Sequence, residues 1–152
     1  MSRIDFGAKP LLFPMPVLII GTYDENGVPN AMNAAWGMIS DFKEISISLS
    51  EHKTTANLAV TGEFTVSIAT EDTVVACDYV GIVSANDEPD KFAKAGFHAT
   101  KSDKVNADES VLTDGKIDPK KLKPIAYDPA NNTYVTLGDI VGKAFSDGLQ
   151  LK

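Results

Sequence analysis

Alternating apolar and polar residues predict a β-hairpin near the start of the chain. The apolar, β-branched run 17–22 leads into Asp24-Glu25-Asn26-Gly27. Asn-Gly supplies the positive φ angles that a tight hairpin turn needs, so a returning strand is expected. Residues 30–40 fit that strand, with Met32, Ala34, Trp36 and Met38 on one face and Asn33, Ala35 and Gly37 on the other. The small residues of the second face would let a ligand approach the backbone.

The next segment predicts a strand, a loop and a short helix. In residues 45–49 three aliphatic side chains alternate with serines, which predicts one core face and one hydroxyl-rich face. The helix follows, with Lys53 or Thr54 as its N-cap and Gly62 at its end.

Further along, the pattern alternates between strands and helices. Residues 64–68 read as a strand, and Asp72 can cap an apolar helix that runs to Val83. Residues 86–92 resemble a capped helix start that Gly96 ends. Residues 101–124 are polar and show no strong strand pattern, and the next strand is expected at 134–137. The short connections favour an antiparallel sheet or barrel.

Composition narrows the class of protein. The 152 residues carry a formal net charge of −7, which argues against a nucleic-acid binder, because phosphate contacts need a basic surface. The length suits one domain with a core of its own. The longest strongly apolar run, 17–20, is far shorter than the roughly 20 residues that cross a bilayer. With no secretory signal pattern, we expect a cytoplasmic protein without a membrane partner.

Familiar catalytic and metal-binding signatures are missing. Cys77 is the only cysteine and reads as a small buried hydrophobe, and His52 and His98 lie far apart, so no metal site is expected. The phosphate-loop, dinucleotide and nucleophile-elbow motifs are absent as well. The acidic residues form no convincing catalytic pair, and the tyrosines show no spacing that marks a site.

One cluster of polar residues can bind an anion. A strand end, a loop and a helix start bring together hydroxyl donors, one ammonium group and free backbone N–H groups, which suit a phosphate. The cluster consists of Ser48, Ser50, Lys53, Thr54, Thr55 and Asn57. The alternative is that Thr54 only caps the helix and Lys53 is solvated, and this segment alone favours that alternative.

Two further segments gain meaning only in combination. Trp36 is the single tryptophan, and its small neighbours would let a flat ligand lie against the backbone, although in isolation it reads as a core residue. Asp90-Lys91-Phe92 could present a cation and an aromatic edge at a pocket mouth, although a solvated helix start explains it equally well.

An ordered series of segments carries a family resemblance. The series comprises residues 16–22, 27–30, 33–36, 48–58, 62–66, 78–81, 84 and 90–92, and near the end 134–138 and 141–142. Together these segments resemble the flavin reductase-like FMN-binding split barrels, most specifically over residues 14–106. The resemblance implies a mainly β fold with short helices, a split β-barrel of Greek-key type that forms a single domain over residues 1–152.

The same resemblance implies a cofactor and its contacts. FMN would lie near the interface of a homodimer, with its phosphate near Lys53 and its ring beside residues 33–36 and 48–50. Lys91 and Phe92 would lie near the exposed flavin edge. The implied cofactor-binding residues are Asn33, Ala34, Ala35, Trp36, Ser48, Leu49, Ser50, Lys53, Thr54, Thr55, Asn57, Ser84, Lys91 and Phe92. No catalytic side chain is needed, because the flavin carries the hydride or electrons.

One departure from the family pattern follows residue 107. Family members usually carry further strands between segments like Lys104–Ala107 and Asp108–Leu112, which are joined directly here. Either the barrel lacks strands or the printed sequence omits a stretch. We favour the omission, because lost strands would expose sheet edges and core unless a partner chain covered them.

The resemblance leaves more than one function open. The leading hypothesis is an NAD(P)H-dependent flavin reductase-type oxidoreductase, with NADH or NADPH as the reductant. The alternative is an FMN electron carrier of the flavoredoxin type, which exchanges electrons with a redox partner protein and does not turn over nicotinamide. A third interpretation is a scaffold that has lost its flavin.

Overall fold

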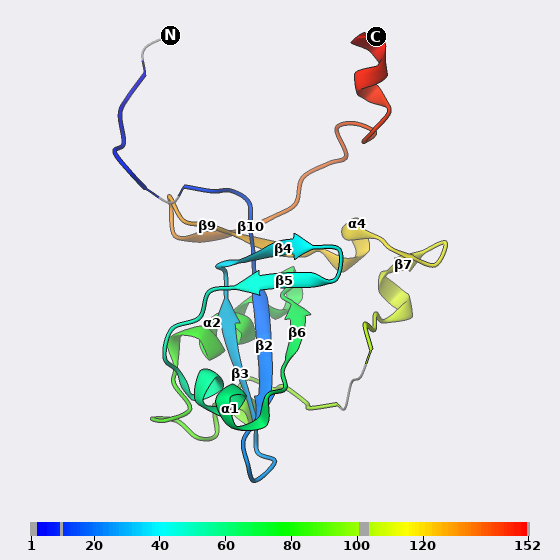
Figure 1. Ribbon diagram of the computed structural model, residues 1–152. Helices are drawn as coiled ribbons and strands as arrows, with labels where there is room; N and C mark the ends of the chain where they lie inside the picture. Colours follow the sequence, from blue (N-terminus) through cyan, green and yellow to red (C-terminus); the bar gives the residue numbers. More distant parts are fainter. Residues whose placement is uncertain (1–2, 10, 101–103, 152) are drawn as a thin grey trace.

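The central sheet is built around the hairpin that the sequence predicts. The computed structural model describes residues 3–9, 11–100 and 104–151. In it β2 (Leu18–Tyr23) pairs antiparallel with β3 (Pro29–Ala34) on one side and with β6 (Thr65–Ile68) on the other (Figure 1). The turn closes with the Asp24 N–H donating to the Val28 carbonyl at 3.0 Å, and Gly27 adopts a φ of 77°. The hairpin prediction is therefore confirmed.

The predicted strand 30–40 is two strands, which corrects the expectation. β3 ends at Ala34, and β4 (Gly37–Asp41) pairs with β5 (Glu44–Ile47) in a separate hairpin. A Cβ on Gly37 would lie 2.6 Å from Leu18 Cδ1, so the new hairpin crosses close to β2 at a residue without a side chain. Because β3 ends at Ala34 and β4 belongs to a different sheet, Trp36 and Met38 do not continue the buried face of Met32. Their side chains are 53% and 59% exposed.

The first helix lies where the sequence places it, with a different N-cap. α1 (Lys53–Thr61) follows His52 and ends at Gly62, whose φ is 71°. The N-cap is His52 rather than Lys53 or Thr54, and its backbone N–H donates to Thr55 Oγ1 at 2.8 Å. Thr54 is thereby free to turn toward the sheet.

The following helices also differ from the prediction mainly at their starts. α2 (Val74–Ile82) has Thr73 as its N-cap, because the predicted cap Asp72 lies within a preceding 3-10 turn, η1 (Glu71–Thr73). α3 (Lys91–Lys94) begins later than expected, after Pro89, and Gly96 follows its end with a φ of 73°.

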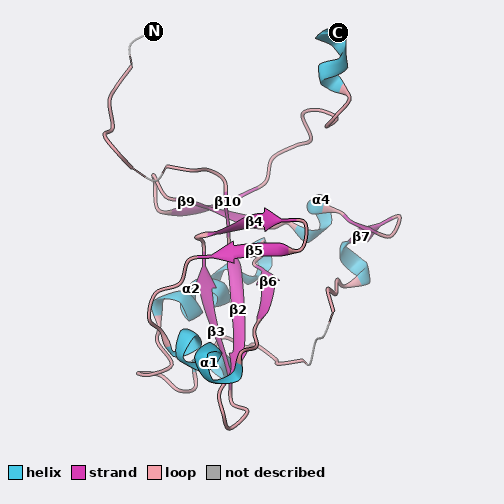
Figure 2. Cartoon of the chain, viewed as in Figure 1, coloured by secondary structure: helices cyan, strands magenta, loops and turns pink. Residues whose placement is uncertain are grey.

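Residues 104–151 add short elements to this core. Of the segment without a strand pattern, the described part contains η2 (Glu109–Val111), the hairpin of β7 (Leu112–Thr113) and β8 (Lys116–Ile117), and α4 (Pro119–Leu122). β9 (Ile125–Asp128) then pairs with β1 (Met15–Pro16) and with β10 (Thr133–Thr136), which confirms the strand predicted near residue 134. η3 (Asp147–Leu151) follows near the C-terminus. The described chain is thus mainly strands with short helices, as expected (Figure 2).

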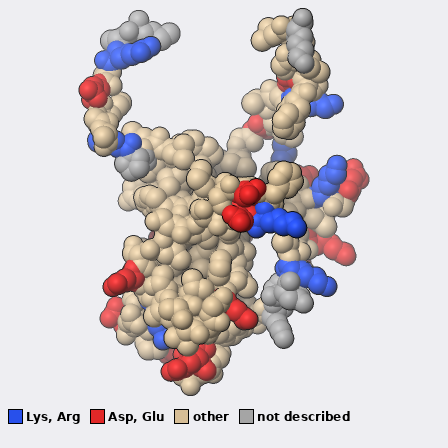
Figure 3. Space-filling view, in the orientation of Figure 1, with Lys and Arg blue, Asp and Glu red and all other residues tan. Residues whose placement is uncertain are grey.

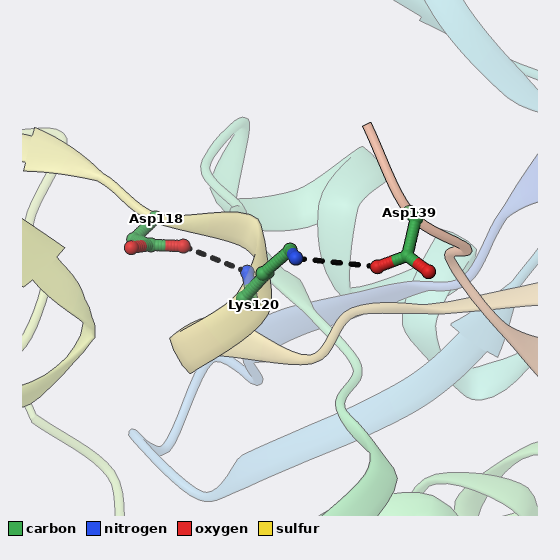
Figure 4. A network of polar contacts seen from close by, with 3 residues as sticks. All are labelled: Asp118, Lys120 and Asp139. Atoms are coloured by element: carbon green, nitrogen blue, oxygen red, sulfur yellow. Dashed lines mark hydrogen bonds and ion pairs between the residues drawn. The ribbon is translucent and has the colours of Figure 1, made fainter. Parts of the chain in front are cut away.

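A surface ion pair ties α4 to the C-terminal segment (Figure 4). Asp118 accepts from the Lys120 backbone N–H at 2.9 Å, and Lys120 Nζ lies 3.2 Å from Asp139 Oδ1. Both charged groups of the pair are largely exposed, so the contact adds little to the free energy of unfolding.

The core consists of two clusters on opposite faces of the central sheet. Leu18, Ile20, Met32 and Ala34 form one cluster, which Ile47, Leu49 and Val66 extend. The other cluster joins Val17, Ile19, Ala31, Ala69, Cys77 and Ile125. Burial of Cys77 agrees with its prediction as a small core residue.

The sheets do not close on themselves. Among the described residues, the outer edges of β3 and β6 pair with no further strand. The N-terminal and C-terminal segments extend away from the body at the same end of the molecule (Figure 1). Within the described residues no helix is both long and apolar enough to span a bilayer.

Candidate functional site

A small pocket of about 130 Å³ lies between the beginning of α1 and the end of α2. Its lining combines the start of one helix with the last turn of the other and with the loop that leads to α3. The lining residues are Met32, His52, Lys53, Thr54, residues 80–85 and Lys91. It therefore brings together Lys53, Thr54, Ser84 and Lys91, four of the residues predicted to bind a cofactor.

Lys91 is the most unusual member of this pocket. Its side chain is 3% exposed, and Nζ donates to the carbonyl oxygens of Val80 at 3.0 Å and of Val83 at 2.8 Å. These carbonyls lie at the C-terminus of α2, where the helix dipole favours a cation. Burial lowers the pKa of Lys91. An ammonium group has three donors, so one N–H remains for a ligand.

The pocket carries positive charge in a protein that is acidic overall. Lys53 and Lys91 line it, and none of its described lining residues is acidic, whereas the chain as a whole has a net charge of −7. The first-turn N–H groups of α1 have no partner within the helix and add a partial positive charge. This arrangement can bind an anion such as a phosphate group.

Thr54 and Asn57 make hydrogen bonds that the sequence did not predict. Both are buried, 1% and 3% exposed, and they connect α1 to the sheet. Thr54 Oγ1 accepts from Asn30 Nδ2 at 2.7 Å, and Asn57 Nδ2 donates to Thr22 Oγ1 at 3.2 Å. They fix the position of the helix start, although Thr54 also lines the pocket. The Asn30 Oδ1 atom is buried without a hydrogen-bond partner.

A second group of predicted residues lies at the junction of β3 and β4. The Ser48 backbone N–H donates to the Trp36 carbonyl at 2.8 Å, so the ends of residues 33–36 and 48–50 are joined. The half-exposed Trp36 ring packs against Tyr127, with ring centroids 6.1 Å apart. Together with the small, partly buried Ala35, this provides a partly open aromatic surface.

Gly81 lies between the small pocket, called the anion pocket below, and the residues at the β3–β4 junction. It lines the anion pocket, and a Cβ built on it would lie 2.8 Å from the Cβ of Asn33. Only a residue without a side chain allows this approach of α2 to β3. The anion pocket and the β3–β4 junction are therefore neighbours across Gly81.

The structure does not bring every predicted residue to this region. Phe92 packs against Phe97, at a centroid distance of 5.7 Å, and against the cluster that contains Cys77. Leu49 packs against the cluster of Ile20, and Thr55 Oγ1 is occupied in the cap of α1. Lys91 is buried in the pocket rather than presented at an exposed edge, and its Nζ donates to two carbonyls at the end of α2.

Three residues near the junction had no role in the prediction: Asp78, Tyr127 and Tyr134. Tyr134 Oη donates to Asp78 Oδ1 at 2.7 Å and accepts from Asn33 Nδ2 at 3.2 Å. Burial and the bond to Asp78 raise the pKa of Tyr134 to about 12. No local spacing could have found this contact, because Asn33 and Tyr134 are 101 residues apart.

A larger cavity of about 1080 Å³ lies on the other face of the sheet. Ile19, Gly21, Ala31, Cys77 and Phe92 are among its lining residues. Of the predicted site residues, only Phe92 lines it. We place the candidate site at the smaller pocket because the charges converge there. Among the described residues, no group of histidine, cysteine and acidic side chains could hold a metal ion.

Comparison with known proteins identifies the family of the chain. The family described as flavin reductase like domain matches residues 11–115. The flavoredoxin of Desulfovibrio vulgaris (Miyazaki F) has a similar structure with a TM-score of 0.88 and 31% identity, covering 97% of this chain and 100% of that chain. No curated protein matches the chain.

More distant structures share the fold alone. Flavoredoxin from Methanosarcina acetivorans has a TM-score of 0.87 at 21% identity, with all of both chains covered. An FMN-binding domain of a flavin reductases-like enzyme from Shewanella baltica OS155 has a TM-score of 0.69 at 18% identity, covering 84% of this chain and 88% of that chain. The fold is a split barrel, as expected. The chain belongs to the family of flavin reductase-like domains.

Proposed function

We propose that this chain binds FMN and works as a flavin oxidoreductase that passes a hydride from NADH or NADPH to the flavin. The observation that carries the proposal is the positive pocket of Lys53 and Lys91 beside the β3–β4 junction. The family supports a flavin, and the similar Shewanella baltica domain is named for FMN. The flavin would supply the redox chemistry.

The residues present fit such a cofactor. A pocket of 130 Å³ is too small for a whole mononucleotide, since pockets that enclose drug-sized ligands start at about 300 Å³, but it suits a terminal phosphate. Lys91, Lys53 and the N–H groups of α1 would hold that phosphate. The surface at Ala35 and the half-exposed Trp36 would receive the ring.

The alternative function is an FMN electron carrier without nicotinamide turnover. Structural similarity to a flavoredoxin at 31% identity favours this alternative. Both functions use the same flavin contacts, and the carrier would need a redox partner protein. No side chain of the site needs to exchange a proton in either case.

Absorbance spectra separate the two functions. The purified protein is supplied with FMN, desalted and then given NADH or NADPH without oxygen. Bleaching of a retained flavin band by the nicotinamide supports the reductase, and bleaching by dithionite alone supports the carrier. Absence of a flavin band after addition of FMN would contradict both.

The phosphate pocket has a test of its own. Lys91→Met and Lys53→Ala should each weaken FMN binding by about tenfold or more, because each removes a charge-assisted hydrogen bond. Riboflavin, which has no phosphate, should bind both variants as it binds the unaltered protein. Lys94→Met is the matched control, since Lys94 is largely exposed and pairs with Glu88. Equal losses for FMN and riboflavin would contradict this phosphate site.

We propose that two chains form a homodimer with the flavin near its interface, and the exposed apolar surface is the observation that supports the dimer. The chain exposes 11755 Å², whereas a compact monomer of 16.3 kDa exposes about 7,500 Å². Exposed apolar residues lie on the β4–β5 hairpin, such as Ile39 and Phe42, and on both terminal segments. On the face in Figure 3, most of the body carries no charged side chains. A sedimentation mass near that of one chain would contradict the dimer.

A further inference from the structure

Three polar side chains from distant parts of the chain meet beside the candidate site. Tyr134 on β10 donates to Asp78 on α2, and Asn33 on β3 donates to Tyr134. The oxygen atoms of Tyr134 and Asp78 are 2.7 Å apart, a short distance that is typical of a hydroxyl bonded to a carboxylate. Neither of the two contacts is local, so the tertiary fold assembles the group.

The direction of these hydrogen bonds orients the Asn33 amide. A carboxylate can only accept, so the hydroxyl hydrogen of Tyr134 points to Asp78, and its oxygen accepts from Asn33. The high pKa of Tyr134 keeps that hydrogen in place at neutral pH. The NH₂ end of Asn33 therefore faces Tyr134, and Oδ1 is left to accept from another donor.

The backbone of α2 restricts Asn33 from a second side. A Cβ on Gly81 would come within 2.8 Å of the Cβ of Asn33, so helix backbone packs directly against this side chain. Asn33 and Met32 point to opposite faces of β3, so Asn33 is not part of the pocket lining. Along the chain Asn33 lies just before Ala35 and Trp36, the proposed position of the ring.

We infer that Tyr134 and Asp78 are positioning residues that orient the Asn33 amide, so that its Oδ1 atom accepts a hydrogen bond from an N–H donor on the bound ligand. A flavin ring carries one such donor, its imide N–H. The inference rests on the proposed function for the identity of the ligand. The hydrogen bonds that orient Asn33 are already present in the protein without a ligand.

A simpler role would be to fasten β10 to α2. In that case Tyr134→Phe would lower the free energy of unfolding without acting on the ligand through Asn33. A double-mutant cycle separates the two roles, because residues that act through one another give non-additive effects.

The experiment measures FMN and riboflavin affinity by fluorescence titration in Tyr134→Phe, Asn33→Ala and the double variant. We expect Tyr134→Phe to weaken both ligands about tenfold, because the ring is common to both, and to add less than twofold in the Asn33→Ala background. Tyr79→Phe is the matched control, a partly buried tyrosine next to Asp78 whose hydroxyl is outside this group. Unchanged affinity in Tyr134→Phe, or a tenfold loss that persists without Asn33, would overturn the inference.

A second variant covers the case in which Tyr134→Phe fails to fold. Asp78→Asn keeps the side-chain shape and removes the charge, so the tyrosine titration near pH 12 should move toward 10 in ultraviolet absorbance. The side-chain amide signals of Asn33 in ¹⁵N NMR spectra of the ligand-free protein should shift in the same variant. Unshifted amide signals would overturn the inference.

These readouts distinguish failure of the inference from failure of the proposed function. If the unaltered protein binds neither FMN nor riboflavin, the proposed function and the flavin contact of Asn33 are both overturned. If it binds both ligands and only the cycle is additive, the inference alone fails. A variant that loses FMN binding but keeps riboflavin binding has lost a contact to the phosphate. We expect this result for Lys91→Met and not for variants of Asn33.

Discussion

The two faces of the β3-β2-β6 sheet are covered in different ways. On one face α1 and the β4–β5 hairpin cover Leu18, Ile20 and Met32, and two buried hydrogen bonds connect the helix to the strands. On the other face the strands present Gly21 and Ala31 to a cavity of about 1080 Å³. The first face is closed by apolar packing and polar contacts, and the second is only partly covered by α2.

The difference explains where the candidate site lies. The closed face fixes the start of α1 through Thr54 and Asn57, and a fixed helix start is needed for an anion pocket of defined shape. The open face carries no such convergence of charge. It lies in a sheet whose two outer edges are unpaired among the described residues.

The largest expected effect compares one aliphatic residue from each face. Ile20 is fully buried in the closed face, so Ile20→Ala should lower the free energy of unfolding by about 3–4 kcal/mol. Ile19 lines the cavity, so Ile19→Ala should cost less, about 2 kcal/mol, because fewer packing contacts are lost. Urea unfolding measures both. Equal losses would show that the two faces are equally well packed.

A smaller effect tests the polar contacts of the closed face. Thr54→Val removes the acceptor of the buried Asn30 amide, and we expect a loss of about 2 kcal/mol in the free energy of unfolding. Thr54→Ser keeps the hydroxyl and should lose about 1 kcal/mol or less. Urea unfolding of the two variants decides the matter. If valine were as well tolerated as serine, the hydrogen bond would not be needed to hold α1.

The smallest effect is on how the free energy of unfolding depends on pH, and it tests the contact between Tyr134 and Asn33. Asn33 lies on the same face of the sheet as Ile19. The folded protein raises the Tyr134 pKa from 10 to about 12, so folding holds a proton that the unfolded chain releases. This contribution is fully present below pH 10 and is lost as the pH rises through about 12. The free energy of unfolding should therefore fall more steeply across that range in the unaltered protein than in Tyr134→Phe. Parallel curves from urea unfolding at each pH would contradict the shift.

Local patterns in the sequence predicted much of the fold. The Asn-Gly turn, the helix end at Gly62 and the strand near residue 134 were all found, because a few neighbouring residues decide each of them. The same patterns failed at 35–36, where the chain leaves one sheet and begins another hairpin. No local pattern within residues 30–40 predicts that Gly37 packs closely against Leu18.

The candidate site, too, was predictable from the sequence only in part. The sequence by itself determined that hydroxyl, amide and ammonium groups gather at the start of α1, and the ordered segments indicated the family. Only the tertiary structure decided that Thr54 and Asn57 hold the helix, that Lys91 is buried at the end of α2, and that Tyr134 reaches Asn33. The physical reason is that periodicity and capping act within a few residues. Burial and hydrogen-bond partners depend on which distant segments the fold brings into contact.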